Sequence, residues 1–170
     1  MNTDRREDPE QDAPATLNPV LPDYLADPFC FRHEGWYYAV ATGKAEGYSP
    51  SFEGPRVVPM VKSRDLRTWE RVGRVLELPE EPFTCFWAPE VAMDDGRFYL
   101  YYHPCRAGKG GYHIRVAVAD YPEGPYRDTG VPLTDPDVNP FAIDSHAFRD
   151  DDGQRHMFYA TDFLDFDDTT

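Results

Sequence analysis

The sequence lacks the features of a membrane, secreted or nucleic-acid-binding protein. No apolar run in its 170 residues approaches the roughly 20 that cross a bilayer, and the N-terminal stretch lacks the apolar centre of a secretory signal. Basic residues are also few: 17 Lys and Arg stand against 31 Asp and Glu, giving a net charge of −14 that disfavours binding to phosphate backbones. We therefore expect a cytoplasmic protein with a neutral or cationic partner and with no nucleic-acid or membrane partner.

Cysteine and histidine are scarce, and neither is spaced as in a metal site. The three cysteines, Cys30, Cys85 and Cys105, are odd in number and include no C-x-x-C pair, so we predict buried, reduced thiols. The five histidines show no H-x-x-x-H spacing. The sequence therefore predicts no metal site built by the protein.

Helical periodicity is absent as well, and strand signals fill most of the chain. Residues 1–18 are polar, acidic and proline-containing, which is typical of a disordered tail. From 19 to 170, short runs rich in Tyr, Phe, Val and Trp alternate with Gly, Pro and Asp clusters. With 41% hydrophobic and 15% aromatic residues, this part can build a packed core. The predicted fold class is all-β.

Three segments of the chain repeat one another. They start at Ala26, Pro89 and Asp144, and each contains an acidic residue, an alternating strand, a turn ending in glycine and an aromatic strand. The turn glycines Gly35, Gly96 and Gly153 follow one another at steps of 61 and 57 residues. Two further strands per repeat complete a four-stranded meander, the plan of a β-propeller blade. We predict blade 1 at about 22–80, blade 2 at about 86–135 and the first hairpin of blade 3 at about 141–164.

Three acidic residues are predicted to gather at one mouth of this propeller. Asp27, Glu90 and Asp144 each stand at the head of an innermost strand, and such strands begin at the same end of the channel. Clustered carboxylates repel one another, so the group suggests a site, and paired carboxyl groups are the equipment of glycosidic hydrolysis. The structural alternatives are a turn-capping role for Asp27 and an ion pair with an arginine for Glu90.

Aromatic side chains precede one of these acids. Phe86 and Trp87 lie just before Glu90, where an aromatic ring could stack on the apolar face of a sugar; the alternative for Trp87 is packing between blades. His146, two residues after Asp144, could reach a sugar or could be a hydrogen-bonded strand histidine. The run of aspartates at 150–152 lacks the ligand spacing of an EF-hand and is read as a solvated turn.

Four stretches, in order, resemble landmarks of the family 43 glycoside hydrolases. They are ADPFCFRHEGWYYAVATG from Ala26, SRDLRTWERVGRVL from Ser63, WAPE with the following YLYYHP, and AIDSHAFRDDDG from Ala142. The family consists of five-bladed propellers with arabinofuranosidase, xylosidase and endo-arabinanase members. The resemblance implies that the chain corresponds to the N-terminal portion of such a propeller, about two and a half blades.

The resemblance also implies roles for individual residues. Asp27 matches the general base that deprotonates the attacking water, and Asp144 matches the carboxylate that orients the general acid and modulates its pKa. Trp87 and Glu90 match a segment that lines the sugar pocket. The implied substrate is a neutral pentose-containing oligosaccharide or glycoside, hydrolysed with inversion.

The chain departs from the family pattern in two places. Ser145 stands where a proline usually follows the aspartate, and no residue matches the family's general acid, a glutamate in the blade after Asp144. We expect the N-terminal part of a longer protein or, as the alternative, chains that associate through an open blade edge. No cofactor is expected within this chain; the calcium ion often held in a complete propeller uses a histidine of a later blade.

Two rival functions stay open at this stage. One is a carbohydrate-binding or interaction propeller that kept the pocket and lost the chemistry. The other is a related five-bladed enzyme that acts on fructosides or mannosyl linkages. The WAPE and AID contexts favour family 43.

Overall fold

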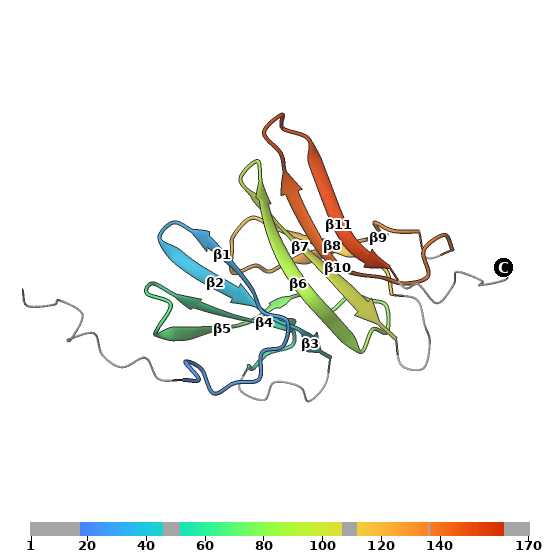
Figure 1. The fold of residues 1–170 in the computed structure, drawn as a ribbon. Helices are drawn as coiled ribbons and strands as arrows, with labels where there is room; N and C mark the ends of the chain where they lie inside the picture. Colours follow the sequence, from blue (N-terminus) through green and yellow to red (C-terminus); the bar gives the residue numbers. More distant parts are fainter. Residues whose placement is uncertain (1–17, 46–51, 107–111, 136, 162–170) are drawn as a thin grey trace, which may run out of the picture.

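The computed structural model describes residues 18–45, 52–106, 112–135 and 137–161, and these residues form strands only. Because this part of the chain contains no helix, it contains none long and apolar enough to cross a membrane. Three antiparallel sheets lie side by side as successive blades (Figure 1). The prediction of an all-β, partial propeller of about two and a half blades is confirmed. Nearly all of the predicted tail, 1–17, lies outside the described residues.

The first sheet is a four-stranded meander. Its strands are β1 (Phe29–His33), β2 (Trp36–Val40), β4 (Val57–Ser63) and β5 (Trp69–Leu76), in the spatial order β1-β2-β4-β5. β4 is buried along almost its whole length. The short β3 (Gly43–Lys44) leaves this sheet and pairs with β6 of the next one.

The second sheet repeats the plan. It contains β6 (Cys85–Asp94), β7 (Arg97–Cys105), β8 (Arg115–Ala119) and β9 (Arg127–Pro132), in the order β3-β6-β7-β8-β9. A parallel bridge between Leu76 and Tyr126 ties it to the first sheet. The Tyr126 amide donates to the Val75 carbonyl at 2.9 Å, and the Glu77 amide donates to the Tyr126 carbonyl at 2.9 Å.

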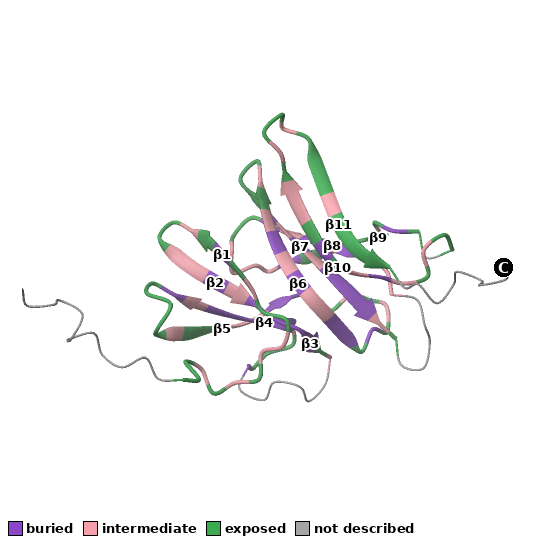
Figure 2. Cartoon of the chain, viewed as in Figure 1, coloured by how far each residue is buried: buried purple, intermediate pink, exposed green. Residues whose placement is uncertain are grey.

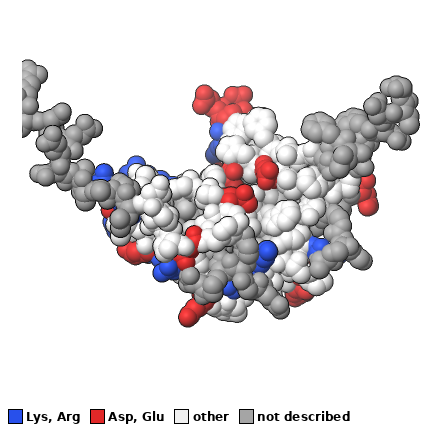
Figure 3. Space-filling model, turned by 60° about the horizontal axis from the view of Figure 1, so that its bottom comes forward, with Lys and Arg blue, Asp and Glu red and all other residues white. Residues whose placement is uncertain are grey.

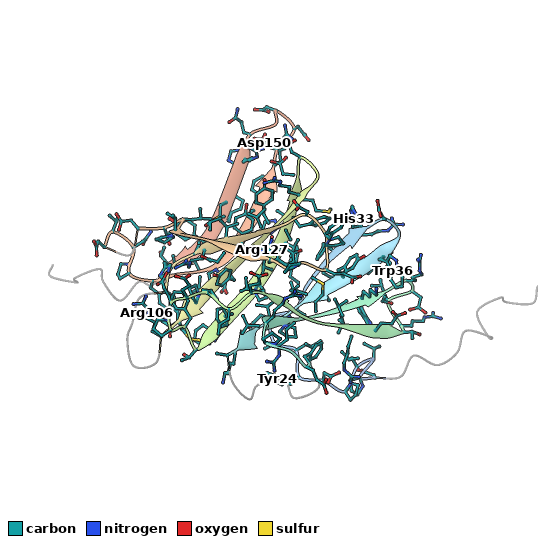
Figure 4. All side chains as sticks on the ribbon, turned by 180° about the vertical axis from the view of Figure 1, so that it is seen from behind. Tyr24, His33, Trp36, Arg106, Arg127 and Asp150 are labelled. Atoms are coloured by element: carbon teal, nitrogen blue, oxygen red, sulfur yellow. A yellow bond between two sulfur atoms is a disulfide. The ribbon has the colours of Figure 1, made fainter. Side chains whose placement is uncertain are left out.

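The third sheet is the hairpin of β10 (Ala142–Arg149) and β11 (Arg155–Thr161). A bridge between Tyr112 and Phe141 joins it to the second sheet. Among the described residues β11 pairs with β10 alone, and most of its residues are exposed (Figure 2). Acidic side chains gather at the tip of this hairpin, where Asp150 lies (Figures 3 and 4).

The repeated glycines take the conformation that their turns require. In the first two hairpins a two-residue turn, Glu34-Gly35 or Asp95-Gly96, joins the strands, and all four residues have positive φ. This is the primed turn that matches the twist of the flanking strands. The third hairpin differs, because Arg149 pairs with Arg155 and five residues form its loop.

The core lies between the first two sheets. The Phe31 ring stacks on Tyr38 with centroids 5.2 Å apart and contacts Phe98 of the second sheet at 6.4 Å. Phe86 and Tyr102 are fully buried in the same cluster, with ring centroids 5.8 Å apart. The predicted sugar-contacting role of Phe86 is therefore wrong, because side chains alternate along a strand and this one points into the core.

The prediction of three buried, reduced thiols is also wrong. Cys85 and Cys105 are direct partners across β6 and β7, with Cα atoms 5.2 Å apart, and they form a disulfide. This spacing lies in the usual range for such a bond. Cys30 is the free cysteine and is exposed. A pairing across 20 residues depends on strand register, so the absence of a C-x-x-C pattern could not reveal it.

Candidate functional site

The innermost strand of each blade bends at one equivalent place. In β6, Trp87 pairs with His103 and Glu90 with Tyr101, so two residues, Ala88 and Pro89, lie opposite one. In β10, Ile143 pairs with Ala160 and His146 with Phe158, again two residues opposite one. Such two-for-one bulges bend a strand and redirect side chains, and they are frequent beside active sites.

The same bulge precedes β1. The Thr42 amide donates to the Ala26 carbonyl at 2.9 Å, and Phe29 pairs with Val40, so Asp27 and Pro28 lie opposite Ala41. The first bulge residue has left-handed backbone in every blade. Its φ is 49° at Asp27, 38° at Ala88 and 54° at Asp144. Non-glycine residues seldom adopt this conformation, so its recurrence makes these positions candidates for a functional site.

The three bulges line one surface depression of about 300 Å³, which we call the three-bulge depression. Blades 1 and 2 each contribute three consecutive residues and blade 3 contributes two. The lining residues are Asp27, Pro28, Phe29, Ala88, Pro89, Glu90, Asp144 and Ser145. The structure thus brings together the three carboxylates that the sequence singled out.

The equivalence assumed for these acids needs one correction. The bulges align Asp27 with Ala88 and Asp144, whereas Glu90 aligns with Phe29 and His146. The steps from Asp27 to Ala88 and on to Asp144 are 61 and 56 residues, close to the steps between the turn glycines. Glu90 enters the depression two residues later in its blade, so two repeated aspartates and one additional glutamate form the acidic group.

Glu90 and His146 contact each other across blades 2 and 3. His146 Nδ1 lies 2.6 Å from Glu90 Oε1, and the Glu90 side chain is 13% exposed whereas that of His146 is 57% exposed. Burial raises the pKa of Glu90, and the neighbouring His146 acts in the opposite direction. His146 is therefore the hydrogen-bonded strand histidine that the sequence offered as an alternative, and its partner Glu90 lines the depression.

Asp27 is held by a buried hydroxyl group. Thr42 Oγ1, in a residue that is 4% exposed, donates to Asp27 Oδ2 at 2.8 Å. This bond occupies one carboxylate oxygen, while the residue itself is exposed at the surface of the depression. The protein thereby orients the carboxylate through one oxygen, while the residue stays accessible to solvent.

Ser145, the residue after Asp144, contacts the buried His103. The Ser145 amide donates to His103 Nε2 at 3.3 Å, and His103 is fully buried. Burial lowers the pKa of His103 to about 4, so the ring is neutral near pH 7 and Nε2 can accept this hydrogen bond. The proton of the neutral ring is then on Nδ1.

Trp87 lies beside the three-bulge depression without lining it. Its ring stacks on Tyr112 with centroids 5.1 Å apart, and Tyr112 meets Phe141 edge to face at 5.0 Å. Trp87 lines a neighbouring depression of about 620 Å³. The other residues around it are Lys44, Ala45, Pro82, Phe83, Thr84 and Cys85. Trp87 is only partly buried, so its stacking on Tyr112 still leaves part of the residue at the surface of this second depression.

No group of three or more His, Cys, Asp or Glu side chains in the described part of the chain is arranged to hold a metal ion. The described residues by themselves thus offer no such side-chain group for the calcium ion that is often held in a complete propeller.

Two residues of the site, Thr42 and His103, escaped the sequence reasoning. A signal for them existed, because each stands seven residues after its turn glycine, Gly35 or Gly96. Aligning the repeats beyond the hairpins would have paired them. Their difference in residue type hid the correspondence.

Comparison with known proteins gives consistent results. The sequence profile of glycosyl hydrolases family 43 matches residues 16–165. Xylosidase/arabinosidase 43B of Humicola insolens is 32% identical over 152 residues, covering 84% of this chain and 26% of that protein. Beta-D-galactofuranosidase xynD of Aspergillus niger is 30% identical over 159 residues, covering 84% and 44%. The chain thus spans less than half the length of these relatives.

Solved structures agree with the sequence matches. The crystal structure of a thermostable family-43 glycoside hydrolase superimposes with a TM-score of 0.69 at 31% identity. The match covers 85% of this chain and 44% of that one.

Proposed function

The chain belongs to family 43 of the glycosyl hydrolases, and on this basis we propose that the three-bulge depression hydrolyses arabinose- or xylose-containing glycosidic bonds with inversion. The observation that carries the proposal is the convergence of Asp27, Glu90 and Asp144 on one depression, with two of them at equivalent strained bulges. A neutral pentose unit suits a protein whose net charge would repel anionic substrates.

The proposed base is Asp27. Its carboxylate, held by Thr42, takes a proton from a water molecule that attacks the anomeric carbon from the face opposite the leaving group. Asp144, on the bulge of blade 3, orients the general acid and keeps that acid protonated by charge repulsion. Inversion follows because the water, and not a carboxylate, forms the new bond.

Inversion also needs a protonated carboxyl group that donates to the leaving oxygen. Of the residues lining the three-bulge depression, Glu90 is the candidate, because burial raises its pKa and favours the protonated form. The other source is a glutamate outside the described residues: on a further blade, as the family resemblance implies, or on a second copy of the chain.

The test combines turnover, stereochemistry and mass. The 170-residue chain is incubated with p-nitrophenyl α-L-arabinofuranoside, β-D-xyloside and β-D-galactofuranoside, the last because one relative is a galactofuranosidase. Proton NMR identifies the anomer formed first, calorimetry measures binding of xylotriose, and light scattering gives the oligomeric state. We expect release of a pentose as the inverted anomer.

The other possible results would contradict this proposal or locate the acid. Retention of configuration would refute Asp27 as a base acting through water. Binding of xylotriose without turnover would favour a non-catalytic carbohydrate-binding propeller, and absence of both would overturn the proposal. Turnover by a discrete oligomer would indicate that copies complete the site through the open edge at β11, whereas turnover by a monomer would assign the acid to this chain.

Trp87 supplies a prediction about sugar binding. Because an aromatic face stacks on a sugar ring, Trp87→Ala should weaken xylotriose binding by about 1–3 kcal/mol, a magnitude borrowed from base stacking. Trp69→Ala, which alters another half-buried tryptophan on β5, is the control and should leave binding unchanged. Unchanged binding together with lost stability in Trp87→Ala would instead make Trp87 a packing residue for Tyr112.

A further inference from the structure

Thr42 and His103 occupy equivalent places in successive blades. Thr42 is bonded to Ala26 and His103 is the strand partner of Trp87, the residues that directly precede the bulges of blades 1 and 2. Each side chain also reaches a backbone amide in the bulge of the following blade. The Ala88 amide donates to Thr42 Oγ1 at 3.0 Å, and the Ser145 amide donates to His103 Nε2 at 3.3 Å.

Thr42 makes three hydrogen bonds that connect two bulges. Its amide donates to Ala26 at 2.9 Å, its hydroxyl donates to Asp27 at 2.8 Å, and the same oxygen accepts from Ala88 at 3.0 Å. The hydroxyl therefore donates a hydrogen bond to the carboxylate in blade 1 and accepts one from the backbone amide in blade 2. Because Thr42 is buried, water cannot readily replace these partners.

The residue directly after Thr42 is packed closely against β4. A Cβ added to Gly43 would lie 2.6 Å from the Val58 nitrogen and 2.9 Å from its Cα. Real Cβ atoms do not approach backbone this closely, so Gly43 is required where β3 passes β4. Gly43 thus lets the backbone next to Thr42 pass close to β4, while the hydrogen bonds to Asp27 and Ala88 set the place of the Thr42 hydroxyl.

His103 performs the corresponding task for the third blade. It reaches from β7 to the amide that directly follows Asp144 in the bulge of β10. An amide donor aimed at Nε2 requires a ring without a proton on that atom, which is the neutral ring with its proton on Nδ1. The blade 3 equivalent of both residues is Ala160, which has no polar side-chain group.

We propose that Thr42 and His103 are positioning residues, which transmit the placement of one blade to the next and hold the carboxylates of Asp27 and Asp144 in register across the depression. This inference rests on the proposed function, because it assigns the two residues a task in the same reaction. Neither residue contacts the sugar in this scheme. Their effect is on the geometry of the aspartates, which are in strained backbone that neighbours must maintain.

The decisive experiment uses threonine variants of the 170-residue chain. Thr42→Val keeps the volume and removes the hydroxyl, and should lower kcat by about 100-fold with little change in KM, as expected when a reacting group is misplaced. Thr42→Ser restores the hydroxyl and should recover most of the loss. Thr134→Val is the matched control: Thr134 is also buried and its hydroxyl accepts the Ile114 amide at 3.0 Å, but it lies away from the depression.

His103 is tested in the same way. His103→Leu removes the acceptor and should lower kcat, whereas His103→Gln can present an amide oxygen to the Ser145 amide and should recover part of the activity. If His103→Leu and His103→Gln lose activity equally while both unfold at the same temperature as each other, the positioning role of His103 is refuted. Equal loss of kcat in Thr134→Val and Thr42→Val would refute the role of Thr42. The loss would then be the general effect on stability of removing a buried hydroxyl.

A second readout separates this inference from the proposed function. NMR measures the amide shifts of Ala88 and Ser145 and the carboxyl ¹³C shifts of Asp27 and Asp144, without any need for turnover. If the wild-type chain is inactive but these resonances move in Thr42→Val and His103→Leu and return in Thr42→Ser and His103→Gln, hydrolysis is refuted and the placement of the aspartates is supported. If turnover is present and the resonances do not move, the hydrolase stands and the positioning inference is overturned.

Discussion

Replacing Asp27 by asparagine is expected to lower kcat by about 10²–10⁴-fold, the range that a general base contributes. An amide cannot take the proton of the attacking water, so the chemical step should fail even though the substrate still binds. Asparagine adopts left-handed backbone as readily as aspartate does, and its oxygen can still accept the Thr42 hydroxyl. The fold and the affinity for xylotriose should therefore be retained.

Asp95→Asn is the matched control for this variant. Asp95 also has positive φ, at 47°, and its side chain is 82% exposed in the turn between β6 and β7, away from the three-bulge depression. The same chemical change there should leave kcat unchanged. A stopped assay on p-nitrophenyl glycosides, together with calorimetry for binding, measures both variants; undiminished turnover in Asp27→Asn would remove Asp27 from the role of base.

Removing the carboxylate of Asp128 should lower the free energy of unfolding by about 3–5 kcal/mol, because it would leave Arg115 buried with an incomplete set of partners. The side chains of Arg115 and Asp128 are 3% and 8% exposed. Arg115 Nε donates to Asp128 Oδ2 at 3.1 Å, and the Tyr102 hydroxyl and a second guanidinium nitrogen also donate to this carboxylate. Glu81, 38% exposed, would be the guanidinium's remaining carboxylate.

Urea unfolding of Asp128→Ala tests this prediction. The control is Asp120→Ala, since Asp120 is 78% exposed and lies 3.7 Å from Arg97, and exposed pairs of this kind contribute at most about 1 kcal/mol. A double variant, Arg115→Met with Asp128→Leu, should be less destabilised than Asp128→Ala, since no charge is then left buried without its partner. If Asp128→Ala and Asp120→Ala have equal effects, the buried network contributes no more than a surface pair.

The repeated hairpins were predictable because their signals are local. Asp95-Gly96 and the aromatic strand after it define a turn and a face by themselves, and the same pattern recurs around Gly35. The grouping of Asp27 and Asp144 at one mouth followed from the same reasoning. Each of these inferences needs only the period of a strand and the conformation of a turn.

The errors have a common cause in strand register. The sequence placed Glu90 beside the two aspartates as an equivalent, because an acidic residue before a strand looks alike whether or not a bulge intervenes. Ala88 holds the equivalent place, and only the backbone pairing on either side of the bulge reveals this. The inward direction of Phe86 and the pairing of Cys85 with Cys105 depend on the same register.

The amino-acid sequence by itself determined that this protein is an all-β repeat with an acidic mouth, since turn chemistry, aromatic alternation and net charge are properties of short stretches. The tertiary structure decided which residues hold that mouth in shape. Thr42 contacts Asp27 across 15 residues and Ala88 across 46, and His103 contacts Ser145 across 42. Hydrogen bonds between blades depend on how one sheet packs against the next, and no local pattern in the chain encodes that arrangement.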